Sequence, residues 1–126
     1  MTFGAENPEL LPGRQITDST LVDAITQETA TILYTAEPHV RQMQLSGLTI
    51  TNKATYSTTV YAYVGILREA DATVTDWEPL VAPYLMGGGS ATWHGHMYLG
   101  AGDSLAAYAS KANIVTVSFG LEDLTP

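Results

Sequence analysis

The stretch Thr92–Asp123, TWHGHMYLGAGDSLAAYASKANIVTVSFGLED, decides the fold. Its residues Gly100–Asp103, GAGD, separate an apolar run that ends at Leu99 from one that restarts at Leu105. Glycine supplies backbone freedom at positive φ, which we expect at both glycines of this turn, and aspartate can bond its own backbone. The segment therefore predicts a hairpin between two short strands.

A third strand follows the polar break Lys111–Asn113. In residues 115–121 large apolar side chains alternate with Thr116, Ser118 and Gly120. This period of two is typical of a strand with one buried and one exposed face. The quoted stretch thus predicts three closely spaced strands, and it contains no recognisable catalytic motif.

The strongest strand pattern in the rest of the chain is Thr58–Leu67. Its residues 60, 62, 64 and 66 are apolar and share one face, while Tyr61 and Tyr63 share the other. A tyrosine hydroxyl prefers water or a partner, so we expect these two rings on an exposed sheet face or at a subunit contact. Another strand near Leu21–Ile25 is expected from its β-branched residues, although a capped helical turn fits the same segment.

His39–Asn52 changes phase in its middle. Met43 and Leu45 have one parity and Leu48 and Ile50 the other, with Ser46-Gly47 between them. An extra residue shifts the phase of a ladder, so a β-bulge at Gly47 would keep all four on one face.

Regularly spaced turn signals predict an all-β, single-domain antiparallel β-sandwich of about eight strands, with jelly-roll or similar Greek-key connections. We expect the domain to span residues 15–126 and an extended N-terminal arm to span residues 1–14, which contain Pro8, Pro12 and two glycines. Much of the core is expected to consist of Val60, Val64, Ile66, Leu105, Val115, Val117 and Phe119.

The order of these segments resembles a widespread group of small β-sandwich proteins of tailed bacteriophages. The resemblance covers roughly residues 28 to 123, and its motifs are structural. It rests on the segments Ala30–Ala36, Leu45–Asn52, Thr59–Gly65, Leu99–Ser110 and Asn113–Glu122. In phages such modules occur as capsid cement or decoration proteins and as domains of tail or fibre proteins, so the resemblance implies a role in virion structure.

Composition narrows the function classes. With 13 acidic and 5 scattered basic residues, the chain has a formal charge of −8, so binding to a phosphate backbone is not expected. The absence of cysteine excludes disulfides and cysteine-ligated zinc. No signal-peptide pattern and no apolar stretch of about 20 residues is present, so we expect synthesis in a host cytoplasm and no membrane partner.

Metal binding and catalysis have weak signals. His94-Gly95-His96 would place two imidazoles on the same face of a strand, but a third ligand has no obvious source. Gly87-Gly88-Gly89-Ser90 lacks the lysine and the strand-loop-helix context of a phosphate-binding loop, and the serines lack a nucleophile elbow. We therefore expect no enzyme activity, no catalytic residues, no cofactor and no resident metal.

Two segments are candidates for partner contact. Arg68–Gly89 is predicted as the longest irregular segment, and it is too apolar for a solvated linker, so it either caps the end of the sandwich or forms an interface. The N-terminal arm either frays or reaches a neighbouring subunit. The predicted contact residues are Phe3, Leu10, Leu11, Trp77, Leu80, Tyr84 and Met86.

The resemblance favours a capsid cement or decoration protein that binds the outer surface of the major capsid protein shell and stabilises it. Because the edge strands of a sandwich must be covered or paired, we also expect a homo-oligomer, a dimer or a trimer. The alternatives are a tail or fibre component that binds a receptor or carbohydrate, with Trp77, Tyr84 and Trp93 stacking on sugar rings, and a free-standing carbohydrate-binding module.

Overall fold

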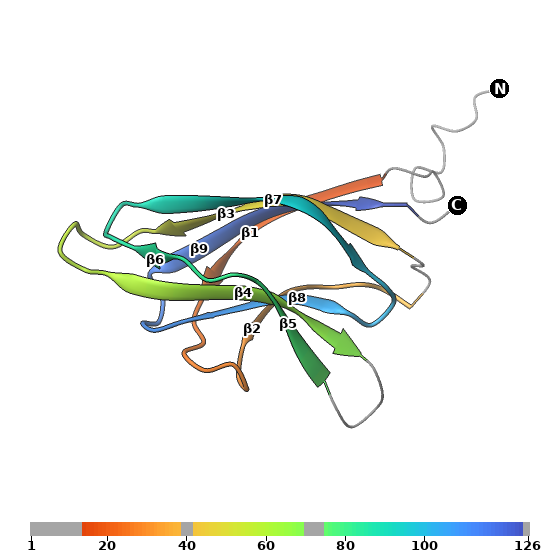
Figure 1. The fold of residues 1–126 in the computed structure, drawn as a ribbon, viewed down its shortest axis with the longest axis horizontal. Helices are drawn as coiled ribbons and strands as arrows, with labels where there is room; N and C mark the ends of the chain where they lie inside the picture. Colours follow the sequence, from red (N-terminus) through yellow and green to blue (C-terminus); the bar gives the residue numbers. More distant parts are fainter. Residues whose placement is uncertain (1–13, 39–41, 70–74, 125–126) are drawn as a thin grey trace.

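A computed structural model describes residues 14–38, 42–69 and 75–124, and these ranges form nine β-strands (Figure 1). The strands are β1 (Arg14–Val22), β2 (Thr31–Thr35), β3 (Met43–Asn52), β4 (Val60–Glu69), β5 (Thr75–Val81), β6 (Tyr84–Leu85), β7 (Ser90–Leu99), β8 (Ser104–Ala109) and β9 (Val115–Asp123). Within these ranges no helix has the length and apolar composition required to cross a membrane.

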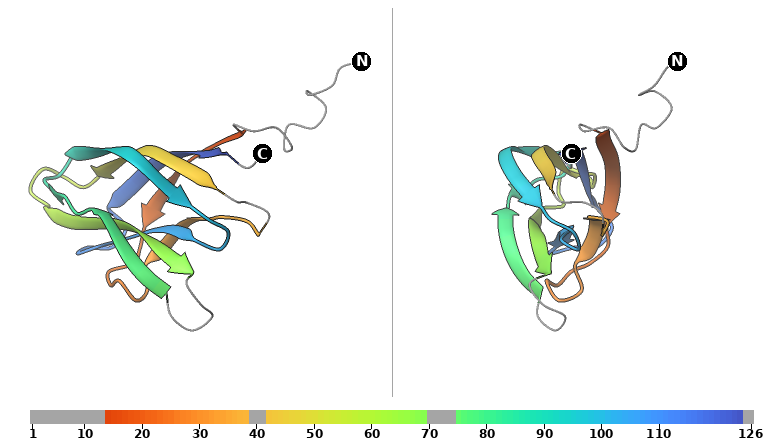
Figure 2. Two further views of the ribbon diagram at one scale, coloured as in Figure 1. Left: turned by 45° about the vertical axis from the view of Figure 1, so that its right-hand side comes forward. Right: turned by 90° about the vertical axis from the view of Figure 1, so that its right-hand side faces the viewer.

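The strands form two antiparallel sheets that pack face to face (Figure 2). One sheet, which we call the β1–β7 sheet, has the order β1-β9-β3-β7; the other, the β2–β5 sheet, has the order β2-β8-β4-β5, and β6 pairs with β4. The chain crosses between the sheets after β1, β2, β3, β6, β7 and β8, so most sheet neighbours are distant in sequence. This arrangement is a jelly roll, which confirms the predicted all-β sandwich.

The core lies between the sheets and consists of the inward faces of the alternating strands. All seven residues predicted for the core are buried, with exposed fractions of 5% or less. On β4 the burial follows the predicted parity, because Val60, Ala62, Val64 and Ile66 are buried while Tyr61 is half exposed. The alternation of the sequence therefore predicts which face of β4 and β9 turns inward.

The phase change in β3 is a β-bulge, as predicted. The register of β3 against both β7 and β9 shifts between Leu45 and Gly47. Met43, Leu45, Leu48 and Ile50 are consequently all buried on one face.

Three local predictions were wrong. The segment Arg68–Gly89 is not irregular throughout, since it contains the end of β4 together with β5 and β6. Pro79 is tolerated in β5 because β5 is an edge strand and needs no ladder donor on its free side. The strand expected near Leu21–Ile25 ends at Val22, and Ile25 is exposed beyond it. In the turn Gly100–Asp103, a positive φ was expected at both glycines, but only Gly102 has one, at 85°.

Two turns pack tightly at the end of the sandwich where β4 begins. A Cβ atom at Gly87 would overlap the Thr55 carbonyl group, so a side chain is excluded there. Buried Asn52 donates from Nδ2 to the Thr58 and Leu85 carbonyls, at 2.8 and 3.2 Å. These contacts fix the start of β4 against β6 and thereby set the position of the rings described next.

Candidate binding surface

Five aromatic side chains lie along the outer face of the β2–β5 sheet. We call this set, Tyr61, Tyr63, Trp77, Tyr84 and Tyr108, the aromatic strip. Tyr61 and Tyr63 share one face of β4, as their spacing of two requires. The strand register places Tyr84 of β6 beside Tyr61 and Tyr108 of β8 beside Tyr63, while Trp77 of β5 pairs with Leu67.

The rings of the strip form two contacting groups, one of Tyr63, Tyr108 and Trp77 and one of Tyr61 and Tyr84. The Tyr63 and Tyr108 rings stack at a centroid distance of 4.5 Å with an interplanar angle of 13°. Trp77 tilts against Tyr108 at 5.4 Å, and Tyr84 tilts against Tyr61 at 4.5 Å. Such stacked and tilted pairs are the favoured geometries of aromatic rings, so each ring restricts the rotation of its neighbour.

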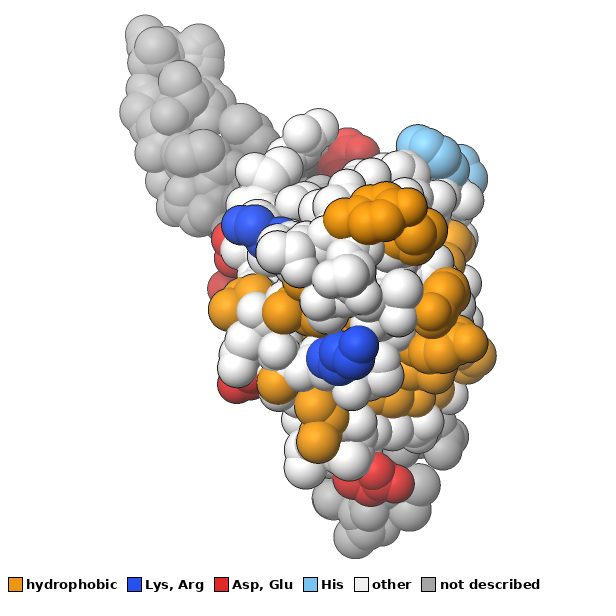
Figure 3. Space-filling view, turned by 90° about the vertical axis from the view of Figure 1, so that its left-hand side faces the viewer, with side chains coloured by type: hydrophobic (Ala, Val, Ile, Leu, Met, Phe, Trp, Pro, Cys, Tyr) orange, Lys and Arg blue, Asp and Glu red, His pale blue; other side chains and the backbone are white. Residues whose placement is uncertain are grey.

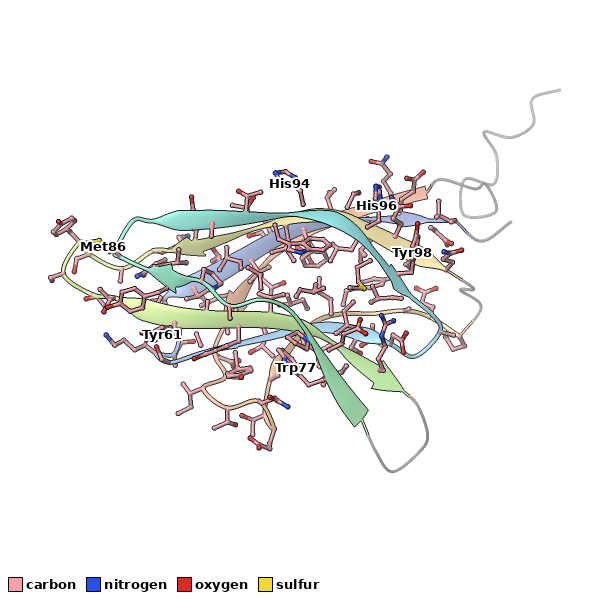
Figure 4. The ribbon with its side chains drawn as sticks, viewed as in Figure 1. Tyr61, Trp77, Met86, His94, His96 and Tyr98 are labelled. Carbon is pink, nitrogen blue, oxygen red and sulfur yellow. The ribbon has the colours of Figure 1, made fainter. Side chains whose placement is uncertain are left out.

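Gly65 has no side chain and so leaves room for the Trp77 ring. A Cβ atom at Gly65 would lie 2.7 Å from the Trp77 ring and 2.7 Å from the Glu78 carbonyl oxygen. The indole therefore rests directly on the backbone of β4, which has no side chain at this point. In Figure 4, Trp77 and Tyr61 lie on the lower sheet, while His94 and His96 stand on the upper sheet.

The strip combines exposed and partly buried rings. Tyr61 and Tyr84 are 50% and 54% exposed, whereas Tyr63, Trp77 and Tyr108 are intermediate. Burial raises the pKa of the Tyr108 phenol, and the nearby Tyr63 and Glu28 raise it further. Tyr108 therefore stays neutral at neutral pH, and the strip offers uncharged ring surface with hydroxyl groups at its edges.

The predicted contact residues fall into three groups. Trp77 and Tyr84 belong to the aromatic strip, whereas Phe3, Leu10 and Leu11 lie outside the described residues. Met86 is 47% exposed in the turn after β6, at the same end of the molecule as Tyr61 (Figure 4). Leu80 is partly buried and packs against the core, so it contributes to the sandwich itself.

Hydrophobic side chains gather at that end of the sandwich, and charged side chains are spread around them (Figure 3). Sequence reasoning did not single out Tyr108, because nothing in residues 104–109 indicates that it stacks on Tyr63. That contact follows from the pairing of β4 with β8, which are 35 or more residues apart along the chain.

Arg68 anchors the opposite end of the same sheet. Its guanidinium donates to Glu78 Oε2 at 2.7 Å, to Asp103 Oδ2 at 2.9 Å and to the Tyr98 carbonyl at 2.6 Å. Partial burial opposes its charged form, but the hydrogen bonds and charges of Glu78 and Asp103 outweigh this and raise the Arg68 pKa. Arg68 thus fixes the turn between β7 and β8 against the strands that bear the strip.

The outer face of the β1–β7 sheet carries mostly polar side chains, with Leu21 and Tyr98 exposed among them. His94 and His96 are both exposed there, as their spacing predicts, and Gln44 Nε2 lies 2.9 Å from His96 Nδ1. In the described ranges no three histidine or acidic side chains are grouped closely enough to hold a metal ion. A shallow hollow of about 180 Å³ lies on this face, over the paired Gly47 and Gly120.

Neither a known protein family nor a curated protein sequence matches this chain. Among solved structures, a protein of the T13 IBDV viral particle superposes with a TM-score of 0.51 at 9% identity, over 91% of this chain and 33% of its own length. The chain thus spans about a third of that protein. The Eiger TNF of S. frugiperda gives a TM-score of 0.47 at 11% identity, over 90% of this chain and 94% of its own. At such identities the likeness shows the fold alone.

Proposed function

We propose that this chain is a structural protein of a bacteriophage virion that binds the outer surface of the major capsid protein shell as a cement or decoration protein. The observation that carries the proposal is the aromatic strip. It presents five rings from four strands on one sheet face, where strand pairing and ring contacts hold them.

The composition of the strip fits a protein contact. Tyrosine and tryptophan are enriched at interfaces because they bury a large area at a low cost in rotamer entropy. Repeated over a shell, such contacts become strong collectively, since each additional copy is held in place by several neighbours. The resemblance of the sequence to virion proteins of tailed phages supports the choice of a capsid as the partner.

Assembly into a dimer or a trimer is part of the proposal. Strands β1 and β7 form the two edges of one sheet, and β2 and β5 lie at the ends of the other. Exposed edges offer unpaired backbone groups to a neighbour. Contacts between copies of the chain would cover them on the shell.

The strip also supports a second candidate, a tail or fibre component that binds a carbohydrate receptor. Exposed rings such as Tyr61 and Tyr84 have the chemistry to stack on sugar rings. This candidate requires that the isolated protein bind sugars, whereas a decoration protein requires affinity for the shell. A glycan array with the purified protein separates the two.

The proposal is tested by locating the protein on intact particles of the phage that encodes it. A gold-labelled antibody against this chain is viewed by electron microscopy, with particles treated with a non-immune antibody as the control. We expect label distributed over the head. Label confined to the tail would transfer the proposal to the fibre candidate, and unlabelled particles would contradict a virion role.

A further inference from the structure

The hollow on the outer face of the β1–β7 sheet is lined by polar and apolar groups in similar proportion, and four of its lining residues have polar side chains. It has a volume of about 180 Å³, and its walls are Gln15, Thr17, Ser46, Gly47, Gly120, Leu121 and Glu122. This volume is equivalent to about six water molecules and lies below the roughly 300 Å³ at which pockets for small-molecule ligands begin. The hollow is therefore sized for the end of a side chain.

Gly120 keeps the hollow open although the fold does not require a glycine there. A Cβ atom at Gly120 would meet only Thr17 Cγ2, at 3.7 Å, which is an ordinary van der Waals contact, and its φ is not positive. A glycine within a strand weakens it. At Gly47, in contrast, a Cβ atom would lie 3.2 Å from the Trp93 carbonyl oxygen, so packing accounts for that glycine.

The lining favours a cationic occupant. Glu122 supplies a carboxylate, Gln15 an amide oxygen, and Thr17 and Ser46 hydroxyl oxygens, whereas among the side chains that the structure describes no lysine or arginine lines the hollow. The chain as a whole has a charge of −8, which attracts positive groups. A guanidinium has five donors in a planar fork that matches a carboxylate together with further oxygen acceptors, whereas an ammonium is a point charge with three donors.

We propose that this hollow receives the arginine side chain of a partner protein, with its guanidinium on Glu122 and its remaining donors on Gln15, Thr17 and Ser46. The inference rests on the proposed function, because that partner is the protein on which the chain docks. The hollow and the aromatic strip lie on opposite outer faces of the sandwich, so the arginine would come from a different neighbouring subunit of the shell than the one that the strip contacts.

The test is a titration of the full chain with N-acetyl-arginine amide, followed by the NMR shifts of the backbone amides. We expect shifts at residues 15–17 and 120–122. Glu122→Gln should weaken binding about tenfold, because the acceptor oxygen remains but its negative charge is lost. Gly120→Ala should abolish binding while leaving resistance to urea unchanged or higher, since alanine fits the strand.

Ser118→Ala, on the same face of β9 but outside the hollow, is the matched control and should bind as the unchanged protein does. N-acetyl-lysine amide and glucose are the comparison probes. Binding that survives Gly120→Ala, or equal binding of either comparison probe, would overturn the inference. The gold-label experiment does not depend on this hollow, so failure of the hollow and failure of the capsid proposal are distinguishable.

Discussion

Arg68 is a single residue that joins three segments at one end of the sandwich. It links β4 to Glu78 of β5 and to Asp103 of the turn before β8. The Glu78 side chain is 43% exposed, so solvent screens that pair, whereas Asp103 is 14% exposed and also accepts from the Gly100 amide. The bond between Arg68 and Asp103 is therefore the more stabilising of the two.

Replacing Arg68→Met should lower the free energy of unfolding by about 1–3 kcal/mol, because a partly buried carboxylate loses its charged donor. Arg68→Lys should recover part of the loss, since lysine keeps the charge but not the fork. Urea denaturation measures both. Lys53→Met removes one exposed positive charge and is the control; equal urea midpoints for Arg68→Met and Lys53→Met would contradict this role of Arg68.

Tyr108 carries a prediction about pH. Its pKa in the folded chain is raised above the ordinary tyrosine value of 10.0, first by burial and then by Tyr63 and Glu28. The unfolded chain therefore loses this proton first as the pH rises. The stability that the neutral phenol contributes is complete below about pH 10 and is lost as the pH rises through the folded pKa.

The free energy of unfolding should accordingly fall as the pH rises from about 10 through the folded pKa, and Tyr108→Phe should reduce the fall. Urea denaturation at several pH values measures it. Tyr56→Phe, at a ring that is 76% exposed, serves as the control and should leave the fall unchanged. Identical pH profiles for Tyr108→Phe and the unchanged protein would refute the assignment.

At the scale of the element, β4 and β5 together make the surface that bears Trp77. Glycine at position 65 lets the indole lie on the backbone of β4. Gly65→Ala would force the Trp77 ring and the Glu78 carbonyl away, which should cost about 1–3 kcal/mol of stability. Gly120→Ala is the control, because its methyl group fits.

Tryptophan fluorescence checks the displacement, measured with Trp93→Phe in both proteins so that only Trp77 emits. We expect the emission of the Gly65→Ala protein to shift to the red as the indole gains contact with water. An emission spectrum identical to that of the Gly120→Ala protein would show that the position of the Trp77 ring does not depend on Gly65.

The elements also show what the sequence can and cannot predict. The alternation of apolar and polar residues predicts β4, β9 and their buried faces, because in a strand with one exposed face every second residue is buried. Alternation does not predict β5, because its residues do not alternate and Pro79 argues against a strand. The aromatic strip and the hollow depend on register between distant strands: Tyr63 meets Tyr108, and Gly47 meets Gly120, only through pairing that no local pattern encodes.

At the scale of the whole molecule, the two outer faces of the jelly roll differ in character. The β2–β5 sheet presents the aromatic strip, and the β1–β7 sheet presents mostly polar side chains, the two exposed histidines and the hollow, together with exposed Leu21 and Tyr98. We propose that the first face makes contacts through its ring surface and the second through hydrogen bonds and charge.

The most direct measurement of the central claim is the binding of the purified chain to capsid shells that lack it, by co-sedimentation. Tyr84→Ala and Trp77→Ala should each weaken binding about tenfold or more, as expected for aromatic anchors at an interface. Tyr56→Ala, which removes an exposed ring outside the strip, should bind unchanged. Urea midpoints verify that the Tyr84→Ala protein is folded. Equal binding by all four proteins would contradict the claim that the aromatic strip docks on the shell.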